Sequence, residues 1–385
     1  MPLINHCNGG GGTPQLCGQV ENFKVMPGTT ALTAALTWAA PDPDEDNSFV
    51  GVRIVRKVDS APTGINDGTV VYEGTALSYT DTGLTAGTTY YYRAFAYNAK
   101  KKYQTAKRTV SIVGTNLTIG ATLNDTTWAQ ISAVSQAGYA ALYWAVGDTK
   151  SIIIDGDVAS FNSGTYYATF SQVAVDAFIL GFDHNAGIEG TKRIHFHIGK
   201  QDGKQTTLST YSGKVSSGQG EFVMGSNSTW SECIMRTDTL GSNKANASSP
   251  GAHNLLAALP SDLRAVMKTC VKYSVLGDTV EKTTEILPLL SLVECFGNGA
   301  STIDVAGNHQ KQYDYYRAGN ETLHYIIDGG SINWSTGRKY TQRVWLRDRS
   351  YYSNPGYYWF QVGDDGSQEK YNYSNNSGVA PIFFV

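Results

Sequence analysis

Residues 19–113 consist of short runs of β-branched and aromatic residues, each followed by residues that favour turns. Two of the turns, PDPD at 41–44 and NDG at 66–68, have an evident mechanism, because Pro presets a turn angle and Asp, Asn and Gly tolerate turn conformations. Strands this short, joined this often by turns, predict a small antiparallel β-sandwich. The predicted strands cover residues 31–38, 51–57, 69–73 and 89–97.

A tyrosine late in this segment points to a particular kind of sandwich. Tyr90 follows a Leu-x-x-Gly turn that contains Leu84 and Gly87, and it begins the run YYYRAFAYN. A Tyr at this offset forms the tyrosine corner of many β-sandwiches. With Trp38 at the end of the alternating run LTAALTW, the segment resembles a fibronectin type III domain over nearly its whole length. The resemblance implies that Trp38, Leu84 and Tyr90 stabilise the fold and carry no chemistry.

Residues 1–18 form a leader that contains four consecutive glycines at 9–12. Glycine loses more conformational freedom on ordering than any other residue, so we expect a flexible or docking segment that orders only against a partner. His6, Cys7 and Cys17 also lie in the leader and offer three zinc-type ligands at loose spacing. A structural zinc site takes four ligands, so a metal site here is the alternative and not the expected reading.

Residues 114–385 contain the helix signals, without a visible repeat or linker. One helix is predicted from Asp125, which can cap it, to Gly138, because the apolar residues of TTWAQISAV recur at helical spacing. A second helix is predicted over 261–270, directly after a proline, and a short helical turn over 291–296.

The same region contains four strand signals and then long polar stretches. Strands are predicted at 151–155, 178–182, 193–198 and 382–385. The last is wholly apolar, and we expect it in the core because an exposed apolar end would promote aggregation. The predicted fold class is therefore mainly β with some α, a β-sandwich followed by a larger α+β domain.

The composition excludes two function classes. Charged residues make up only 16% of the chain and the net charge is −3, which disfavours nucleic-acid binding because phosphates require clustered Lys and Arg. The longest apolar run, 286–296, contains Pro and Glu and is too short to span a bilayer, so we expect no membrane insertion. The start of the chain lacks a basic region followed by an apolar stretch, so we expect synthesis in a cytoplasm without a signal peptide.

The five cysteines are odd in number and widely scattered, which argues against a disulfide framework. Cys270 and Cys295 lie among apolar residues and are predicted to be buried as small hydrophobic side chains.

Four runs within 123–385 are similar to a domain of tail proteins from phages and prophages of Gram-positive gut bacteria. They are LNDTTWAQISAVSQAGYAALYWAVGDTKSIIIDG, GFDHNAGIEGTKRIHFHIGK, WSECIMR with the helix after it, and VWLRDRS with GVAPIFFV. The order Trp-Leu-Arg-x-x-Ser and then Gly-Val-x-Pro also resembles C-type-lectin-like domains of the formylglycine-generating and phage tropism-determinant kind. The resemblance implies a C-type-lectin-like adhesin domain over 114–385, whose last strand pairs in the core and whose loop-rich face binds a ligand.

This resemblance implies a bacteriophage virion protein of the tail tip or a fibre, which binds a receptor on the host cell envelope. Its partners would be other virion proteins, bound through the leader, and a host surface glycan or envelope protein. We expect a homo-oligomer, with a trimer as one form, that is made in the host cytoplasm and acts outside the cell at the host surface. The alternative is a non-catalytic structural or decoration protein that packs on other tail or capsid subunits.

The resemblance does not carry over an enzyme activity. Formylglycine-generating relatives use paired cysteines late in the domain, and this chain has no cysteine after Cys295. We therefore expect no catalysis and no cofactor. An envelope-degrading enzyme is a third alternative, since the paired carboxylates of a glycosidase meet in space and not in sequence.

Two motifs offer metal or acid–base chemistry. His195 and His197 lie on one face of a predicted strand, because side chains alternate with period two. Three such strands around a trimer axis would offer six nitrogens to a metal, whereas the simpler interpretation is structural histidines in a core. In Asp183-His184-Asn185, a carboxylate next to a histidine suits acid–base catalysis or the ordering of a loop. No nucleophile accompanies it, so neither a catalytic residue nor a metal ligand is predicted.

The strongest compositional signal is the stretch 340–376, whose 37 residues include seven Tyr, two Trp and one Phe among Ser, Asn, Gly and Asp. Recognition loops have this composition, because Tyr gives large contact area at low entropy cost and Ser, Gly and Asn give adaptable hydrogen bonds. The stretch is too long and too polar to be buried throughout, so we expect surface loops. An alternative places Trp345 and Trp359 in a β-rich core. The expected ligand-binding residues are Tyr351, Tyr352, Asn354, Tyr357, Tyr358, Tyr371, Asn372, Tyr373 and Asn375.

Overall fold

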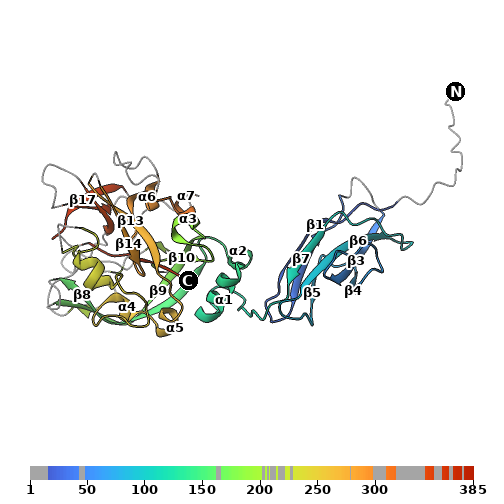
Figure 1. Cartoon of the computed structure of the whole chain (residues 1–385), viewed down its shortest axis with the longest axis horizontal. Helices are drawn as coiled ribbons and strands as arrows, with labels where there is room; N and C mark the ends of the chain where they lie inside the picture. The colour runs from blue at the N-terminus through green and yellow to red at the C-terminus, as the bar shows by residue number, and fades with distance from the viewer. Residues whose placement is uncertain are drawn as a thin grey trace, which may run out of the picture. The chain divides into compact units, whose positions relative to one another are not determined.

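The chain divides into two compact units, Met1–Ile119 and Gly120–Val385 (Figure 1). The sequence placed the division after Val113, but hydrogen bonds from Leu32 N to Thr115 O (2.7 Å) and from Ile119 N to Thr29 O (3.0 Å) tie the following residues to the first unit. No helix in the described part of the chain is long and apolar enough to cross a membrane. The computed structural model describes residues 16–42, 48–161, 166–201, 204–205, 208, 214–215, 222–225, 229–277, 279–297, 309–317, 343–350, 358–363, 367–374 and 377–385.

The first unit is a fibronectin type III-like β-sandwich of two antiparallel sheets. One sheet has the order β1-β2-β5, with β1 (Glu21–Pro27), β2 (Ala34–Ala39) and β5 (Ser78–Asp81). The other has the order β4-β3-β6-β7, with β3 (Phe49–Val58), β4 (Thr69–Gly74), β6 (Thr89–Asn98) and β7 (Thr109–Val113). Four of these strands lie where the sequence predicts them. It missed β5, which is only four residues long, together with β1 and β7.

The core of the sandwich is built by alternation along its strands. In β2, Ala34, Leu36 and Trp38 are buried while the residues between them are not. The Trp38 ring packs 6.3 Å from Phe23 and 5.4 Å from Tyr72, measured between ring centroids. The fold roles expected for Trp38, Leu84 and Tyr90 are confirmed, since all three are buried in this core.

The tyrosine corner is present, because Thr85 N donates a hydrogen bond of 2.9 Å to the hydroxyl group of Tyr90. Replacing Tyr90 with Phe removes this acceptor and leaves the ring in place. We expect the free energy of unfolding to fall by about 1 kcal/mol, since Thr85 is exposed and its N–H recovers water. Urea unfolding of a fragment holding the first unit measures the difference. An unchanged midpoint would show that the corner does not stabilise the unit.

The second unit contains two larger sheets. The first has the order β11-β10-β9-β12, with β8 also paired to β9 and β18 to β10. Its strands are β8 (Thr149–Phe161), β9 (Tyr166–Phe182), β10 (Ile194–Gln201), β11 (Lys204–Gln205), β12 (Lys214–Val215) and β18 (Ile382–Phe384). The second has the order β14-β13-β15-β16-β17. Its strands are β13 (Cys270–Leu276), β14 (Thr279–Glu285), β15 (Val344–Arg349), β16 (Tyr358–Val362) and β17 (Gln368–Asn372). The prediction of a mainly β protein with some α is confirmed.

The N-cap of the first helix, α1 (Trp128–Ala137), lies two residues after the expected cap Asp125. Thr127 is the N-cap and forms a capping box with Gln130, whereas Asp125 accepts a hydrogen bond from the Thr122 hydroxyl group (2.7 Å). The predicted end is confirmed, because Gly138 has a φ of 78° in the left-handed region that glycine adopts without strain. The buried face consists of Trp128, Ile131, Val134 and Ser135.

The predicted helix over 261–270 is wrong. Only one turn forms, α5 (Ser261–Arg264), and Cys270 begins strand β13 instead. The reason is tertiary pairing: all seven residues of β13 pair in register with β14, and this hairpin overrides a local helical pattern. The helical turn at 291–296 is confirmed as α6 (Leu292–Phe296), with a capping box between Ser291 and Glu294. The remaining short helices are α2 (Ala140–Tyr143), α3 (Ala186–Glu189), η1 (Met235–Leu240), α4 (Leu255–Ala258) and α7 (Asp314–Arg317).

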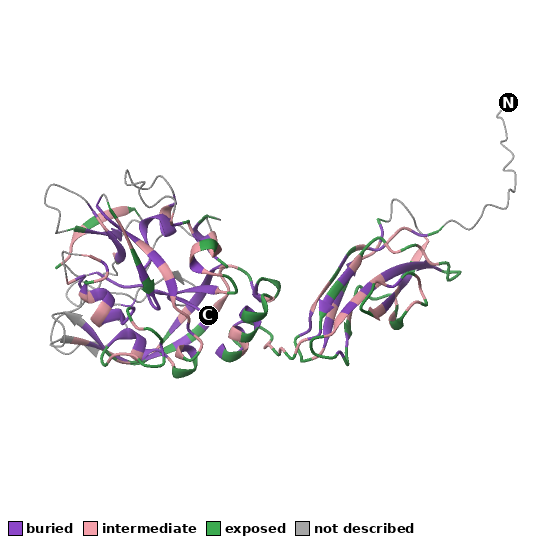
Figure 2. Ribbon diagram, in the orientation of Figure 1, coloured by how far each residue is buried: buried purple, intermediate pink, exposed green. Residues whose placement is uncertain are grey.

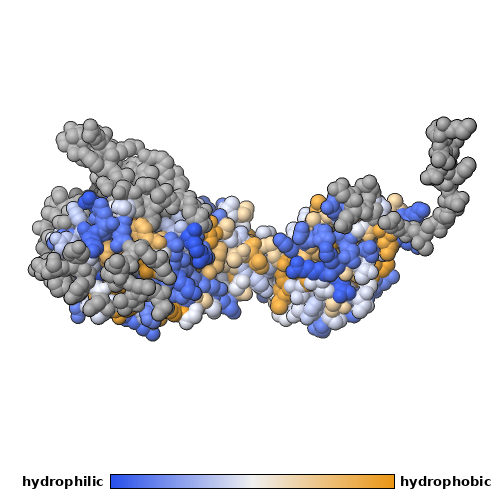
Figure 3. Space-filling model, turned by 90° about the horizontal axis from the view of Figure 1, so that it is seen from above, coloured by the Kyte–Doolittle hydropathy of each residue, from blue (hydrophilic) through white to orange (hydrophobic). Residues whose placement is uncertain are grey.

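The hydrophobic core of the second unit joins its two sheets. One cluster contains Phe178 of β9, Leu346 of β15, Phe360 of β16 and Phe384 of β18. Every residue from 382 to 385 is 0% exposed, so the prediction that the apolar C-terminus lies in the core is confirmed. Buried residues fill the interior of each unit (Figure 2), and the face in Figure 3 shows mainly hydrophilic residues on the described surface, with hydrophobic ones between them.

Candidate functional site

The Tyr-rich C-terminal stretch contains a β-hairpin and is not only a set of loops. Strands β16 and β17 pair antiparallel over five residue pairs, from Tyr358 opposite Asn372 to Val362 opposite Gln368. We call this element the C-terminal hairpin. Of the nine expected ligand-binding residues, Tyr358, Tyr371, Asn372 and Tyr373 lie in or beside it. The other five, Tyr351, Tyr352, Asn354, Tyr357 and Asn375, lie outside the described residues.

The tryptophans of this stretch belong to the core, as the alternative interpretation held. Trp345 and Trp359 are both 0% exposed. The Trp345 indole N–H donates a hydrogen bond of 2.8 Å to Phe222 O, and the Trp359 ring lies 6.4 Å from that of Trp230. Their burial fixes the hairpin on the body of the unit.

The tyrosines of the C-terminal hairpin lie nearer the surface. The Tyr358 side chain is exposed at 41%, although its neighbour Trp359 is fully buried. Across from it, the Asn372 carboxamide oxygen accepts hydrogen bonds from Ser374 N (3.0 Å) and Ser374 Oγ (2.7 Å). The pair places an exposed phenol ring next to an oriented amide group.

The other two described tyrosines are half-buried. The Tyr371 ring lies 6.1 Å from the Trp345 ring and has the Arg343 guanidinium 4.9 Å above it. Tyr373 accepts a backbone hydrogen bond from Met224 N (3.1 Å). These contacts of Tyr371 and Tyr373 help to hold the hairpin in place. Among the described residues of the hairpin, Tyr358 therefore has the most exposed ring.

A second group of interacting polar side chains, which the sequence did not predict, is buried between β13, β15 and the short helices. It is a cluster of charged residues. Lys272 of β13 is 1% exposed, and its ammonium group donates hydrogen bonds to Glu189 (2.6 Å), Glu294 (2.8 Å) and the Tyr313 hydroxyl group (2.9 Å). We call these residues, together with Arg347, the buried charge cluster. Such a network stabilises the fold only while every charge keeps its partner.

Arg347 of β15 completes the cluster at 0% exposure. Its guanidinium donates to Glu294 (2.5 Å), to Leu289 O (2.6 Å) and to Tyr273 O (3.1 Å). Asp348, the next residue, accepts hydrogen bonds from Val275 N and Leu292 N (2.8 and 2.6 Å). The cluster thus ties β15 to β13 and to the start of α6.

The charge states follow from burial and from these contacts. Burial opposes charge on Lys272, but Glu189 and Glu294 outweigh it and raise its pKa. Burial would likewise raise the pKa of Glu294, but Arg347 and Lys272 lower it well below its usual range. For Glu189, burial outweighs the attraction of Lys272 and raises the pKa. Glu189 is therefore the carboxylate of the pair that takes up a proton first.

Two histidines border the cluster. The His184 ring stacks on Tyr313 with centroids 3.8 Å apart, and His195 Nδ1 lies 3.0 Å from the Tyr313 hydroxyl group. Burial, assisted by the Lys272 ammonium, lowers the pKa of His184 to about 3 and the pKa of His195 well below its usual value. Both imidazoles are neutral at pH 7.

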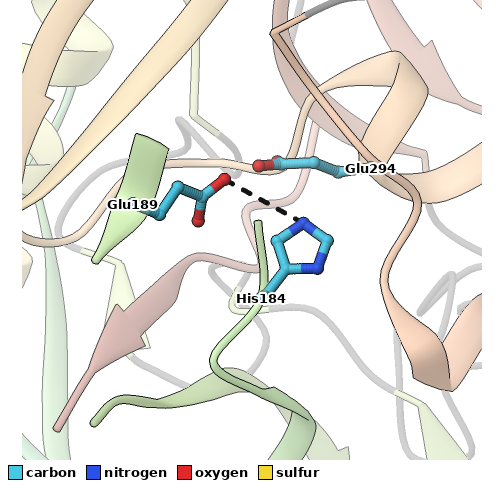
Figure 4. Close-up of side chains that lie close together, drawn as sticks. All are labelled: His184, Glu189 and Glu294. Carbon is cyan, nitrogen blue, oxygen red and sulfur yellow. Dashed lines mark ion pairs between the residues drawn. The ribbon is translucent and has the colours of Figure 1, made fainter. Parts of the chain in front are cut away.

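His184, Glu189 and Glu294 are the described residues best placed to hold a metal ion (Figure 4). One ligand atom from each lies within 4.8 Å of the others, and His184 Nε2 is 3.9 Å from Glu189 Oε1. The Lys272 ammonium, however, already bonds to both carboxylates. In this arrangement the ammonium is the cation that the carboxylates hold, so the geometry favours a structural ion network over a metal centre.

The histidine motifs that the sequence singled out are structural. His195 and His197 are both 0% exposed, and His197 donates from Nε2 to Ala380 O (2.9 Å) while its Nδ1 accepts from the Tyr316 hydroxyl group (3.0 Å). These rings lie inside one unit, so the alternative of a metal on a trimer axis is wrong. Asp183 and Asn185 order their loop, since Asp183 accepts from Arg193 N (2.9 Å) and Asn185 donates to His309 O (3.0 Å).

The cysteines that the structure describes are all buried: Cys17, Cys233, Cys270 and Cys295. Cys17 is 0% exposed and packs in the sandwich core, so the end of the predicted leader belongs to the first unit. His6 and Cys7 lie outside the described residues. For the buried charge cluster, the signal in the sequence is the presence of Lys, Arg and Asp inside the apolar runs CVKYSVL and VWLRDR.

No protein-family model matches the chain, and no curated protein matches it. Similar solved structures include the sixth fibronectin type III domain of human fibronectin type III domain containing protein 3, at 22% identity and a TM-score of 0.22 over 29% of this chain and 98% of that chain. Another is the FN5 domain of Drosophila Lar, at 15% identity and a TM-score of 0.19 over 26% of this chain and 97% of that chain. By its own strand order and tyrosine corner, the first unit is fibronectin type III-like.

Proposed function

We propose that this protein is a bacteriophage virion component of the tail tip or a fibre, which attaches to the host cell envelope through the C-terminal hairpin and the Tyr-rich residues around it. The observation that supports this is that β16 has both buried and exposed aromatic side chains. Trp359 and Phe360 are at most 1% exposed, whereas Tyr358 is 41% exposed. An exposed ring beside the Asn372 amide offers a stacking face and hydrogen bonds, the combination that recognition surfaces use.

We further propose that the second unit is a C-type-lectin-like adhesin domain. Strand β18 at the end of the chain pairs with β10 inside the core, and Gly378–Pro381 leads into it (GVAP). The run WLR lies in the buried strand β15. These features support the resemblance, in which the last strand is a core strand and a loop-rich face beside it binds the ligand.

The remaining parts have supporting roles in this proposal. The first unit is a spacer, and residues N-terminal to Cys17 dock on other virion proteins, since Cys17 itself is buried in the sandwich core. The protein assembles as a homo-oligomer, is part of the virion and acts outside the cell without catalysis. Its ligand is a surface glycan or an envelope protein of the host.

Replacing Tyr358 with Ala tests the proposal. We expect binding to Gram-positive gut isolates, and to wall polysaccharide purified from them, to weaken at least tenfold, the effect of about 1.4 kcal/mol. The melting temperature should change little, because Tyr358 is 41% exposed and does not belong to the hydrophobic core of the unit. Pull-down of the purified protein by intact cells measures the binding.

Ile153→Ala is the matched control, since Ile153 is 40% exposed on β8 of the same unit and lies outside the Tyr-rich stretch. It should bind cells as the unchanged protein does. If Tyr358→Ala also binds undiminished while the unchanged protein binds well, the hairpin is not the contact surface. If the unchanged protein binds no isolate, the structural or decoration role on other virion subunits becomes the better proposal.

A further inference from the structure

A pocket of about 310 Å³ opens in the second unit, formed by residues of β8, β9, the π-helix η1 and the segment before α4. Its polar lining includes Asp238, Lys244 and Asn254, and its aromatic lining is Tyr167 and His253. The volume lies at the lower end of the range for small-ligand sites, which suits a single small molecule. None of these residues belongs to the C-terminal hairpin or to the buried charge cluster.

Asn254 is held rigidly at one wall of the pocket. It is 2% exposed, and its carboxamide oxygen accepts a hydrogen bond of 2.9 Å from Ala257 N, which caps α4. A Cβ atom at Gly241 or Gly251 would lie only 2.6 or 2.7 Å from its Nδ2 atom, so both positions need glycine. Among the described residues, no acceptor forms a hydrogen bond with Asn254 Nδ2. The pocket therefore contains an amide donor in a fixed position that a ligand can use.

His253 adds backbone strain at the pocket. It adopts a φ of 56°, which is uncommon for a residue other than glycine, and its carbonyl accepts a hydrogen bond of 2.9 Å from Ala159 N. Its ring lies against Tyr167 with centroids 4.6 Å apart. Strained residues of this kind gather at ligand sites, where the surrounding structure keeps them in place.

The π-helix contributes the third feature. η1 spans Met235–Leu240 and ends at Gly241, which has a φ of 72°. Short π-helical segments are rare and occur frequently at functional sites. This one places Asp238 at the pocket, where its carboxylate has no ion-pair partner among the described residues.

We infer that this pocket binds one sugar unit of a glycan. The Tyr167–His253 ring pair offers an apolar surface to the C–H face of a sugar ring, while Asp238 accepts and Asn254 and Lys244 donate hydrogen bonds to its hydroxyl groups. One carboxylate balances one ammonium group, which favours a neutral ligand. The inference deepens the proposed function and rests on it for the source of the glycan, namely the host envelope.

Isothermal titration of the full chain with glucose, galactose, rhamnose and N-acetylglucosamine tests the inference. We expect at least one of these sugars to bind, and Asp238→Ala to weaken that binding at least tenfold. Asp262→Asn is the control, because Asp262 is an exposed carboxylate on α5 that does not line the pocket. Its affinity should equal that of the unchanged protein, and near-ultraviolet circular dichroism should be the same for all three proteins.

Absence of binding by all four sugars would overturn the inference, and so would equal affinity of Asp238→Ala and the unchanged protein. Tyr358→Ala separates this result from the proposed function, since it should leave the sugar affinity unchanged while it weakens binding to cells. If cells bind through Tyr358 and no sugar enters the pocket, only the inference fails. If a sugar binds through Asp238 and no cell is bound, only the proposed function fails.

Discussion

Replacing Lys272 with Met is expected to lower the free energy of unfolding of the second unit by about 3–5 kcal/mol. Met fills much of the same volume but leaves Glu189 and Glu294 buried without the ammonium group that both contact. An unpaired buried charge costs several kcal/mol, and two carboxylates that face the same space also repel one another. Urea unfolding followed by tryptophan fluorescence measures the loss.

Lys150→Met is the matched control. Lys150 is 8% exposed, but its ammonium group donates to Asn124 O (3.0 Å) and has no carboxylate in ion-pair contact among the described residues. We expect it to cost about 1 kcal/mol, the value of one hydrogen bond. Adding Glu189→Gln to Lys272→Met should recover part of the stability, because it removes the carboxylate that loses its lysine partner, whereas Glu294 keeps its ion pair with Arg347. Equal costs for the two lysines would show that ion pairing in the cluster contributes nothing beyond packing.

Elements whose signals are local could be predicted from the sequence. α1 follows from helical spacing and a terminal glycine, and α6 follows from the capping pair Ser291 and Glu294 with Gly297 after it. The tyrosine corner is equally local, because Tyr90 bonds to a residue five positions upstream. In each case the interacting groups lie within one turn or one loop. A sequence pattern a few residues long therefore contains both partners of the interaction and is enough to predict it.

Elements decided by distant partners could not be predicted. The stretch that ends at Cys270 has apolar residues at helical spacing, yet β13 starts there because β14 and β15 pair with it. The buried charge cluster shows the same limit, since Lys272 meets Glu189 across 83 residues of chain and Glu294 across 22. A charge within an apolar run signals that a partner exists but not which one it is.

The candidate binding surface could be predicted from the sequence only in part. Composition located the Tyr-rich stretch, but period-two alternation does not identify its exposed ring, because Phe360 lies on the same face of β16 as Tyr358 and is buried. Trp359 is held in the core by Trp230, which lies more than a hundred residues earlier and packs against it. The sequence therefore predicted that part of the Tyr-rich stretch is exposed, and only tertiary contacts show that, among the described residues of this stretch, Tyr358 is the exposed ring.

Acidification from pH 7 to about pH 4.5 is expected to lower the free energy of unfolding of the second unit by several kcal/mol. Burial lowers the pKa of His184 and of His197 to about 3 and the pKa of His195 well below its usual value. In the unfolded chain each imidazole titrates near pH ~6.5. Below that pH the unfolded chain binds more protons than the folded one, so stability falls as the pH falls, by about 1.4 kcal/mol per pH unit for each histidine.

Two buried carboxyl groups act in the opposite direction. Burial raises the pKa of Asp348 to about 6, so its folded form takes up a proton before the unfolded form does and stability rises as the pH falls through that value. Glu189, whose pKa burial also raises, has the same sign. At about pH 4.5 His184 and His197 together cost roughly 5 kcal/mol, and His195 adds a loss of the same sign, against about 2 kcal/mol regained at Asp348. The net effect of acid is therefore a loss of stability.

Urea unfolding at a series of pH values between 7 and 4.5 measures this slope, and one histidine substitution identifies its source. His197→Gln removes an imidazole whose two nitrogens are both hydrogen-bonded in the neutral form, to Ala380 O and to the Tyr316 hydroxyl group. The variant should be less stable at pH 7, but its loss per pH unit should be smaller by about 1.4 kcal/mol. Ile153→Ala removes no titratable group and should keep the original slope. If stability does not fall between pH 6.5 and 4.5, or if both variants share one slope, the buried imidazoles are not the groups that acid protonates.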